Sequence, residues 1–543
     1  MSGVLALLRP DPPPPPPPGP DGKPPPAPSS PTPRALLGLF GVLLAALSSY
    51  LNQYDTNFAR ADLYGGLNLG QDEGLWVTVG FDCGSVAIVV LTAWLSTIFT
   101  PRRIVAFFLV VQLLAAVTVP RMTGYPGLMT MAFLHGVGGG ALVPMLFTTL
   151  LRVLPPNAGR LWGFAAYAMV VCLSPLTGEI IGGYFKEYLG WQTIFWTCLV
   201  LNPIALVLVM AGLPVEKVKL EGFTKGADYF GMMFFTGFAC TLTAALVVGQ
   251  QYDWFSSTLV DTLFVLAAIF LVLFVWEELS VEHPLIELRL LKRRNLSLGL
   301  LIIVMFFFAL QGAAYILPQY GAQIRDFREL QIGVILLWAT IPILVLSPLT
   351  AWVLHYVDAR VVAAVGFLLV VIADRLATYL TSDWVEAEFL TSQIIAACGY
   401  PLVLISLLLC VTSVLQPQDA ISGSTLFNVI RVLAGNFGGA IMGGIVTVRQ
   451  RVHSNIIASD AVTGAFGTVQ REREAGGLSG LSSEVHRQAY VMAYADAYGW
   501  IAMIMIAGIV VLLFVGPAAV ARRPKKEPKG AERTPGPEPQ PAE

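Results

Sequence analysis

The sequence predicts an all-α, polytopic membrane protein, and three observations point to this fold class. Hydrophobic residues make up 55% of the 543 residues and charged residues 13%, whereas soluble domains carry about 25% charged residues. The mean hydropathy is +0.69. Fourteen stretches of the chain have about the length, roughly 20 apolar residues, that a membrane-spanning helix needs.

The fourteen predicted transmembrane helices form two sets of six with a pair between them. They cover residues 35–58, 75–98, 102–120, 127–151, 161–185, 191–213, 227–249, 258–277, 297–320, 331–354, 359–381, 388–415, 424–448 and 494–518. Two pseudo-symmetric bundles with a site at their interface are a common plan of transporters. We therefore expect an N-terminal six-helix bundle (34–213), two linker helices with cytoplasmic loops (214–296) and a C-terminal six-helix bundle (297–518), which contains a long external loop at 449–493.

The distribution of basic residues orients these helices. An even number of helices places both termini on one side of the membrane. With the termini in the cytoplasm, the inner segments hold about 21 of the 33 Lys and Arg residues, as the positive-inside rule requires. We predict a multi-pass protein of a bacterial inner membrane, embedded in the lipid bilayer, with both termini cytoplasmic.

The two ends of the chain differ in composition from the rest. Residues 12–18 are an unbroken run of prolines, and the segment 1–33 favours polyproline II or disorder. Its apolar part is too short for a signal peptide. Residues 519–543 are polar and rich in proline. Both segments are predicted to be disordered cytoplasmic tails, and the first is either a docking site or dispensable.

Charge and cysteine usage exclude several classes of function. The formal net charge is −2, so nothing indicates a nucleic-acid partner. All six cysteines fall in apolar stretches, without the spacing of a metal site or a disulfide framework. The glycine-rich runs at 136–140 and 435–444 lack the Lys-Ser/Thr ending of a phosphate loop. We therefore expect neither an enzyme nor a bound metal or cofactor.

One predicted helix carries an acid within its apolar sequence. Glu179 lies in LWGFAAYAMVVCLSPLTGEIIGGYF (161–185), near Pro175. An ionised side chain in hydrocarbon is costly, so such residues usually face a protein interior or a water-filled path. A titratable acid on a helix that proline weakens suggests proton-coupled transport. The alternative is an acid near a helix end that simply reaches the interface.

Several stretches resemble one known family. STLFNVIRVLAGNFGGAIMGGIVTVRQRVHSNIIA (424–458), QYDTNFARADL (53–63) and SPLTGEIIGGYF (174–185) are similar to segments of the fourteen-helix drug:proton antiporters of the major facilitator superfamily, of the EmrB/QacA type. The resemblance implies a major facilitator fold and proton-driven export of hydrophobic or amphipathic small molecules by alternating access. It also implies two partners, a periplasmic adaptor protein of the EmrA/HlyD type and an outer-membrane channel, which would make the chain the inner-membrane part of a tripartite pump.

The sequence departs from the family pattern at positions that matter for gating. The loop after the second helix keeps the basic pair Arg102 and Arg103, but it has Thr97 and Thr100 where the family has an aspartate and a glycine. Further departures are His355 in the equivalent loop of the second half, Ala132 and His135 in the fourth helix, and Glu179 where the fifth helix of the family has proline. These changes add titratable groups to the first bundle.

Four residues are candidates for proton coupling: Asp55, Glu179, Asp82 and His135. At 1.5 Å of rise per residue, all four fall in the outward half of their helices, where they could form one polar cluster. Carboxylates and imidazole are the groups that can take up and release a proton in such a setting. For His135 the alternative is a hydrogen-bonded packing residue, and Asp62 is expected in an external loop.

The remaining candidates have structural or gating roles. Arg431 and Asn428 lie one turn apart in the thirteenth helix, where the resemblance implies a structural or gating polar cluster. Arg102 and Arg103, in the loop after the second helix, are separate candidates for a gating or structural role. In the fifth helix, small residues and proline permit close helix packing. These are Pro175, Gly178, Gly182 and Gly183.

Two other functions stay open. The departures in the cytoplasmic loops also fit a major facilitator transporter of another solute, such as an organic acid, a siderophore or another metabolite, in export or uptake. A membrane sensor that binds a ligand without transporting it is the third reading. The sequence leaves the substrate, the proton stoichiometry and the oligomeric state open.

Overall fold

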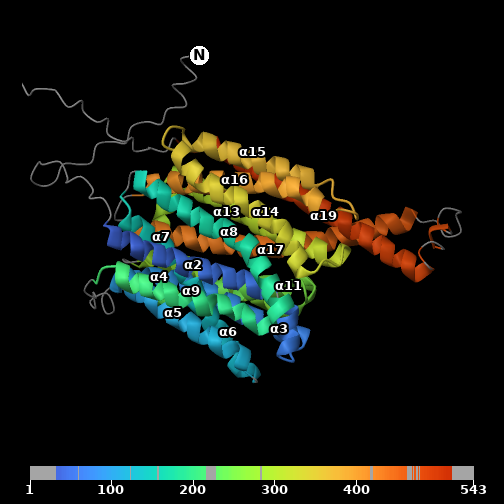
Figure 1. The fold of residues 1–543 in the computed structure, drawn as a ribbon, viewed down its shortest axis with the longest axis horizontal. Helices are drawn as coiled ribbons and strands as arrows, with labels where there is room; N and C mark the ends of the chain where they lie inside the picture. Colours follow the sequence, from blue (N-terminus) through green and yellow to red (C-terminus); the bar gives the residue numbers. More distant parts are fainter. Residues whose placement is uncertain are drawn as a thin grey trace, which may run out of the picture.

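Long helices that run along one common direction make up the protein (Figure 1). The computed structural model describes residues 32–516, apart from 59, 123, 156–157, 216–227, 282–283, 416–419, 461–467, 469, 473–474 and 476, and these residues contain no strand. The predicted tails 1–33 and 519–543 lie outside the described residues, apart from residues 32 and 33.

The helices fall into two halves and a linking pair. The N-terminal half holds α2 (Pro33–Phe58), α3 (Arg60–Gly66), α4 (Gln71–Ile98), α5 (Pro101–Thr118), α6 (Tyr125–Gly140), α7 (Leu142–Val153), α8 (Ala158–Leu189) and α9 (Trp196–Gly212). The linking pair is α11 (Tyr229–Gly249) and α12 (Thr258–Ser280). The C-terminal half holds α13 (Arg294–Ile324), α14 (Glu329–Val353), α15 (Ala359–Ala377), α16 (Glu386–Ser413), α17 (Ala420–Asp460) and α19 (Leu478–Leu512). Short 3-10 helices cover Val119–Arg121, Trp191–Phe195, Trp254–Ser256 and Leu288–Lys292.

The predicted all-α membrane fold is confirmed. In the described part of the chain, thirteen helices are long and apolar enough to cross a bilayer. The predicted span that is missing from these thirteen is 359–381. It corresponds to α15, whose 19 residues include Arg360, Asp374 and Arg375 and which nevertheless packs against α16 and α19 inside the C-terminal half. The predicted span 127–151 is divided at Ala141 into α6 and α7.

The connection 449–493 is a correction to the prediction of a long loop. In the described residues, α17 continues to Asp460 and α19 begins at Leu478, so both helices project beyond the bundle (Figure 1). Arg449 and His453 both contact Asp496 Oδ2, at 2.6 and 2.7 Å, which ties the two helices together. The predicted apolar spans end near residue 448 and begin again near residue 494, whereas the helices continue beyond both points, so hydropathy could not mark their true ends.

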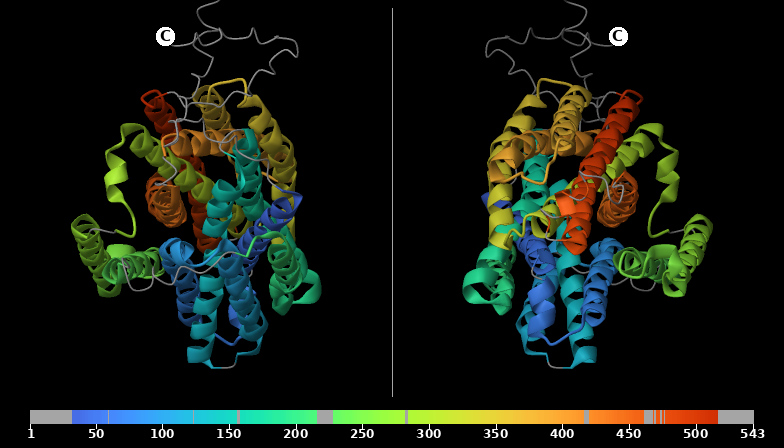
Figure 2. Two further views of the ribbon diagram at one scale, coloured as in Figure 1. Left: turned by 90° about the vertical axis from the view of Figure 1, so that its left-hand side faces the viewer. Right: turned by 90° about the vertical axis from the view of Figure 1, so that its right-hand side faces the viewer.

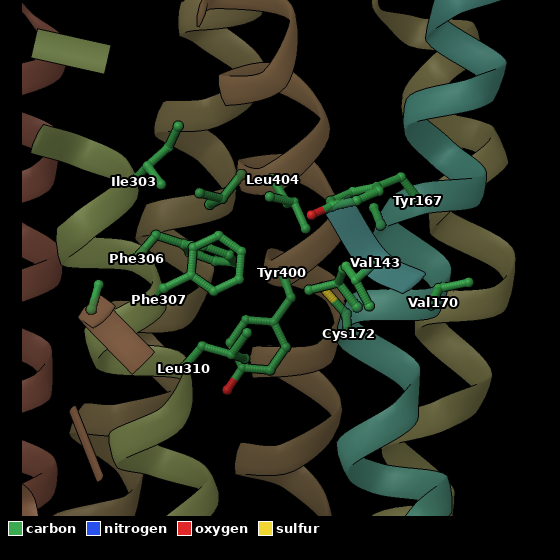
Figure 3. Close-up of a cluster of buried hydrophobic side chains, with 14 of the residues drawn as sticks. Val143, Tyr167, Val170, Cys172, Ile303, Phe306, Phe307, Leu310, Tyr400 and Leu404 are labelled. Atoms are coloured by element: carbon green, nitrogen blue, oxygen red, sulfur yellow. The ribbon is translucent and has the colours of Figure 1, made fainter. Parts of the chain in front are cut away.

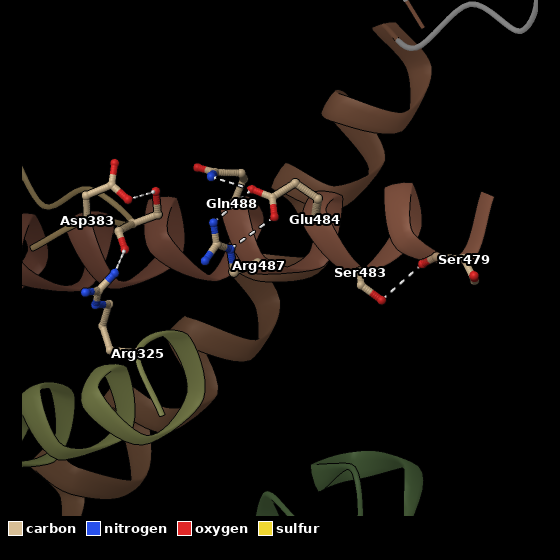
Figure 4. Close-up of polar contacts among 8 residues, drawn as sticks. Arg325, Asp383, Ser479, Ser483, Glu484, Arg487 and Gln488 are labelled. Carbon is tan, nitrogen blue, oxygen red and sulfur yellow. Dashed lines mark hydrogen bonds and ion pairs between the residues drawn. The ribbon is translucent and has the colours of Figure 1, made fainter. Parts of the chain in front are cut away.

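Local polar pairs support the projecting part of α19. Arg487 and Gln488 both donate to Glu484, at 3.1 and 2.9 Å (Figure 4). Such contacts between residues three or four apart stabilise the part of a helix that has no apolar stretch to bury. Nearby, Arg325 after the end of α13 donates to the carbonyl oxygen of Ser382 at 3.4 Å.

Two seams join the halves. On one side α8 packs along α14, and on the other α11 contacts both α4 and α17. Figure 2 shows the two halves stacked, with the linking pair standing at their flank. We call the end of the bundle where α2 begins and α19 ends the terminal face, and the opposite end the distal face (left and right in Figure 1).

The seam between α8 and α14 depends on a glycine. A Cβ atom on Gly333 would lie 2.6 Å from Ile180 Cα, so only glycine permits this approach.

We expect Gly333→Ala to lower the thermal midpoint of the purified protein, because overpacking costs about 1–3 kcal/mol. Gly439→Ala is the matched control, since a Cβ there meets nothing within 4 Å. Size-exclusion chromatography after heating measures both midpoints, and equal midpoints would contradict the role of this crossing.

Candidate functional site

A cavity lies between the two halves. Its wider chamber has a volume of about 330 Å³ and is lined by residues of α2, α4, α8, α11, α13 and α17. A narrower chamber of about 60 Å³ lies on its terminal side, lined by earlier residues of α2, α8, α13 and α17. The two chambers share five lining residues: Gln53, Tyr54, Gln311, Gly435 and Asn436. They therefore form one path along the interface of the halves.

Packed aromatic side chains close the terminal end of this path. Phe147 of α7 stacks on Phe427 of α17 with ring centroids 4.9 Å apart, and Tyr167 of α8 lies 5.4 Å from Phe147. The hydroxyls of Thr148 and Ser424 are 3.3 Å apart. Figure 3 shows buried side chains of both halves facing one another, with Phe307 of α13 on one side, Tyr167 of α8 on the other and Tyr400 of α16 between them in this view. The halves thus touch at the terminal end and separate at the wider chamber.

Glu179 and Asp82 both line the wider chamber. Glu179 comes from α8 and is 6% exposed, and its Oε2 has no hydrogen-bond partner among the described residues. Asp82 reaches the chamber from α4. Pro175 lies four residues before Glu179 and has no backbone donor, so the helix is weakened one turn before the acid. This wall of the cavity therefore carries two carboxylates, one of them on a helix that can bend.

Asp55 lies behind α8 and is absent from the cavity lining. Its carboxylate is fully buried, and Oδ2 accepts a hydrogen bond from the Thr197 hydroxyl of α9 at 3.0 Å. A Cβ on Gly182 would lie 3.0 Å from Asp55 Cα, and one on Gly178 would lie 3.3 Å from Asp55 Oδ1. The small residues of α8 therefore bring α2 and α8 into close contact at this acid. Gly183 faces the other way, where its Cβ would lie 3.0 Å from the backbone nitrogen of Leu330 in α14.

His135 is buried among aromatic rings, and its Nε2 has no hydrogen-bond partner among the described residues. The ring is 2% exposed and lies between Phe81 and Phe195, with centroid distances of 5.3 and 5.7 Å. It does not line either chamber. Of the four candidates for proton coupling, the structure thus brings Glu179 and Asp82 to the cavity wall, and it places Asp55 and His135 outside the lining.

Arg431 lines the narrower chamber. It donates a hydrogen bond to the Tyr50 hydroxyl, and its guanidinium carbon lies 5.6 Å from the Tyr50 ring centre and 6.0 Å from that of Phe307. Asn428, one turn earlier, is fully buried and donates to the Ser424 carbonyl at 2.8 Å. Asn428 therefore belongs to the closed terminal end, whereas Arg431 belongs to the cavity.

Neutral amides line the cavity, and sequence reasoning missed them. The Tyr54 hydroxyl donates to Gln311 Oε1 at 3.0 Å across the interface of the halves. The other amides of the lining are Gln53, Gln250, Gln319 and Asn436. Asparagine and glutamine are rare inside apolar helices, so their positions in the sequence could have indicated this lining. The prediction considered ionisable residues alone.

The retained basic pair and the changed residues of the two cytoplasmic loops lie away from the cavity, as does Ala132 of α6. Arg102 donates to the carbonyl oxygen of Leu213 at the end of α9 at 3.4 Å, and Arg103 is exposed. Thr97 bonds within its own helix, and His355 Nδ1 lies 2.7 Å from the Ala351 carbonyl oxygen. Thr100 precedes α5 as its N-cap, and Ala132 is buried in the packing of α6.

At the distal face, ion pairs join the halves. Lys186 of α8 contacts Asp62 of α3 and Glu329 of α14. Next to it, Arg328 pairs with Glu187 at 3.2 Å. Asp62, expected in an external loop, thus lies on a short helix and contributes to this contact.

Comparison with known proteins agrees with this architecture. The family profile of the Major Facilitator Superfamily matches residues 39–439. The uncharacterized MFS-type transporter YhcA of Bacillus subtilis is 24% identical over 522 residues, which cover 92% of this chain and 97% of the relative. The multidrug export protein EmrB of Escherichia coli is 25% identical over 418 residues, covering 76% and 80%.

Solved structures support the fold. A structure that describes substrate recognition in proton dependent oligopeptide transporters superposes with a TM-score of 0.56 at 14% identity, over 88% of this chain and 98% of that one. The human organic anion transporter MFSD10 gives 0.53 at 14% identity, over 87% and 100%. The resemblance to the EmrB type is confirmed, and this chain belongs to the major facilitator superfamily, as a multi-pass membrane transporter.

Proposed function

We propose that this chain is a proton-coupled efflux transporter, an antiporter that exports hydrophobic or amphipathic small molecules across the bacterial inner membrane. The observation that carries the proposal is the pair of carboxylates, Glu179 and Asp82, on the wall of a cavity between the two halves. The relative EmrB of Escherichia coli is a multidrug export protein by name, which supports export as the direction of transport. The proton gradient is the energy source, and no cofactor is needed.

In this proposal the carboxylates exchange protons with each side of the membrane in turn. A carboxyl group that is removed from water favours its neutral form, so it holds a proton while the cavity is closed. If the termini are in the cytoplasm, the distal face is external, and the two carboxylates take up protons from that side. They release the proton when the cavity opens to the cytoplasm, and each proton moving inward supplies about 2.3 kcal/mol per 100 mV.

The packing of α8 couples this charge change to movement. Gly178 and Gly182 press against α2 beside Asp55, and Gly183 presses against α14. The neutralisation of Glu179 removes the penalty for a charge in a dry interface, so α8 can then close against its neighbours. Asp55 is a second titratable group at the same helix pair, and His135 has a packing role.

The same packing defines two gates. The aromatic contact of Phe147 with Phe427 closes the terminal side, and the contact of Lys186 with Glu329 joins the halves at the distal side. Alternating access requires that the first opens when the second closes more tightly. Arg102 holds the end of α9 and keeps the N-terminal half rigid during this movement.

The partners of the pump are also a proposal. The resemblance to the EmrB type suggests a periplasmic adaptor protein of the EmrA/HlyD type and an outer-membrane channel. Crosslinking in intact cells followed by purification of the tagged chain tests this assembly. If no adaptor is recovered while export continues, the transporter acts alone.

A second candidate is a transporter of a polar solute such as an organic acid or another metabolite. The amides of the cavity wall favour it, because Gln53, Gln311 and Asn436 offer hydrogen bonds that a purely apolar drug cannot use. In proton-driven export the solute and the proton cross the membrane in opposite directions, whereas in proton-driven uptake they cross in the same direction.

The coupling role of the carboxylates predicts that Glu179→Gln and Asp82→Asn abolish uphill transport. Such variants keep the volume of the side chain but cannot exchange a proton, so substrate-dependent proton flux in proteoliposomes should fall at least about tenfold. Asp55→Asn should lower the substrate-dependent proton flux by less. Asp374→Asn is the matched control, because Asp374 is a buried acid of α15 that does not line the cavity. Full proton flux in Glu179→Gln would refute the coupling proposal.

The direction of coupling predicts opposite results for the two candidate functions. In everted vesicles with an acidic interior, an antiporter should accumulate substrate as protons leave. A symporter should accumulate substrate only when the exterior is acidic. The measurement uses a fluorescent amphipathic dye, and a vesicle lacking the protein is the blank. Accumulation that follows the acidic exterior would replace antiport by symport.

The terminal gate predicts that a crosslink there stops transport. In the double variant Thr148→Cys and Ser424→Cys, a disulfide should form across the two hydroxyl positions, which are 3.3 Å apart. Oxidation should then stop substrate flux, and a reductant should restore it. The single-cysteine variants control for the native thiols. Unchanged flux in the crosslinked protein would show that this contact does not open during transport.

A further inference from the structure

Arg431 has no opposite charge beside it in the structure. The side chain is 7% exposed, its Nε atom lacks a partner, and no carboxylate forms an ion pair with it among the described residues. Its contacts are the Tyr50 hydroxyl and the rings of Tyr50 and Phe307. Aromatic rings attract a cation more weakly than a carboxylate does. A buried guanidinium of this kind marks a place for an anionic group.

The opposite charge lies in the same cavity, at its other end. Glu179 and Asp82 line the wider chamber, whereas Arg431 lines the narrower one. Glu179 Oε2 is buried without a partner among the described residues, so it also awaits a hydrogen-bond donor. Gln53, Gln311 and Asn436 line both chambers and connect the two ends. The cavity is therefore cationic at one end, acidic at the other and lined with amides between.

The charges decide which kind of molecule this cavity can exchange for protons. A purely anionic molecule would be repelled by ionised carboxylates, so it would bind together with protons. A purely cationic molecule would displace the proton from the carboxylates but would leave Arg431 unpaired. A molecule that carries both charges displaces the proton at one end and pairs with Arg431 at the other. Antiport fits the second and third cases, because proton and substrate then compete for the carboxylates. Only the third case also supplies an anionic group for Arg431.

We propose that the transported molecule is amphoteric, with an anionic group bound by Arg431 and a cationic group beside Glu179 and Asp82. This inference rests on the proposed function, in that it takes the cavity as the transport path. The amides hydrogen-bond the middle of the molecule. A carboxylate suits Arg431, since the guanidinium can donate two parallel hydrogen bonds to it.

The test compares three probes with the same carbon chain. They are 8-aminooctanoate, its methyl ester, which keeps only the cation, and its N-acetyl derivative, which keeps only the anion. Binding to the full-length protein in lipid nanodiscs is measured as stabilisation against heat at increasing probe concentration. We expect the free amino acid to bind at least about tenfold more tightly than either derivative. The set is repeated with six- and twelve-carbon chains, so that length does not decide the result.

Variants of Arg431 and Glu179 show which residue binds which charged group of the probe. Arg431→Gln should remove the advantage of the amino acid over its methyl ester, and Glu179→Gln should reduce its advantage over the N-acetyl derivative. Arg431→Lys should retain part of the first advantage, because it keeps the charge. Arg375→Gln is the control, since Arg375 is an exposed arginine of α15 and does not line the cavity.

The outcomes separate this inference from the proposed function. If the methyl ester binds the wild type as tightly as the free acid, Arg431 does not bind an anionic group and the inference fails, whatever the proton flux. If Arg431→Gln fails to fold, the comparison of the three probes on the wild type still decides. If the amino acid binds as expected but drives no proton flux in proteoliposomes, the inference stands and proton antiport fails.

Discussion

The cost of charge in a hydrocarbon solvent is the constraint on which the rest of the structure depends. In a bilayer every backbone polar group must be paired within the protein, which makes the chain helical throughout the membrane. Ionisable side chains must then find a partner, a cavity or the membrane surface. Glu179, Asp82 and Arg431 all reach the cavity formed by the two chambers between the halves. The cavity thus accommodates these three charged groups, whereas Asp55 is buried behind α8 with the Thr197 hydroxyl as its partner.

Close packing around this cavity turns a charge change into movement. The small residues of α8 bring it into close contact with both neighbours: Gly178 and Gly182 contact α2, and Gly183 contacts α14. A shift of α8 must therefore move α2 or α14 as well. A dense interior transmits strain instead of damping it. Pro175 provides the place at which α8 can bend. The rigid contacts and the weak point therefore lie on one helix, next to the acid that changes its charge.

The candidate site could be predicted from the sequence only in part. Glu179 stood out because an acid interrupts an apolar helix, and Asp82 stood out for the same reason. The amides Gln53 and Gln311 drew no attention, although the structure places them in both chambers. His135 has the chemistry of a proton carrier, but aromatic rings surround it. Residue type reports what a side chain can do, and only its neighbours decide whether it faces the cavity.

The sequence by itself determined that the chain is a helical membrane protein of the major facilitator type, because apolar stretches of spanning length and the motifs at 424–458 and 174–185 are local properties of the chain. It also located the acids along their helices, since the helical rise is constant. Only the tertiary structure decided which helices meet at the cavity, that α17 and α19 continue as paired helices beyond the bundle, and that Arg431 faces the chamber wall. These depend on the rotation of each helix about its axis, which contacts between distant segments set.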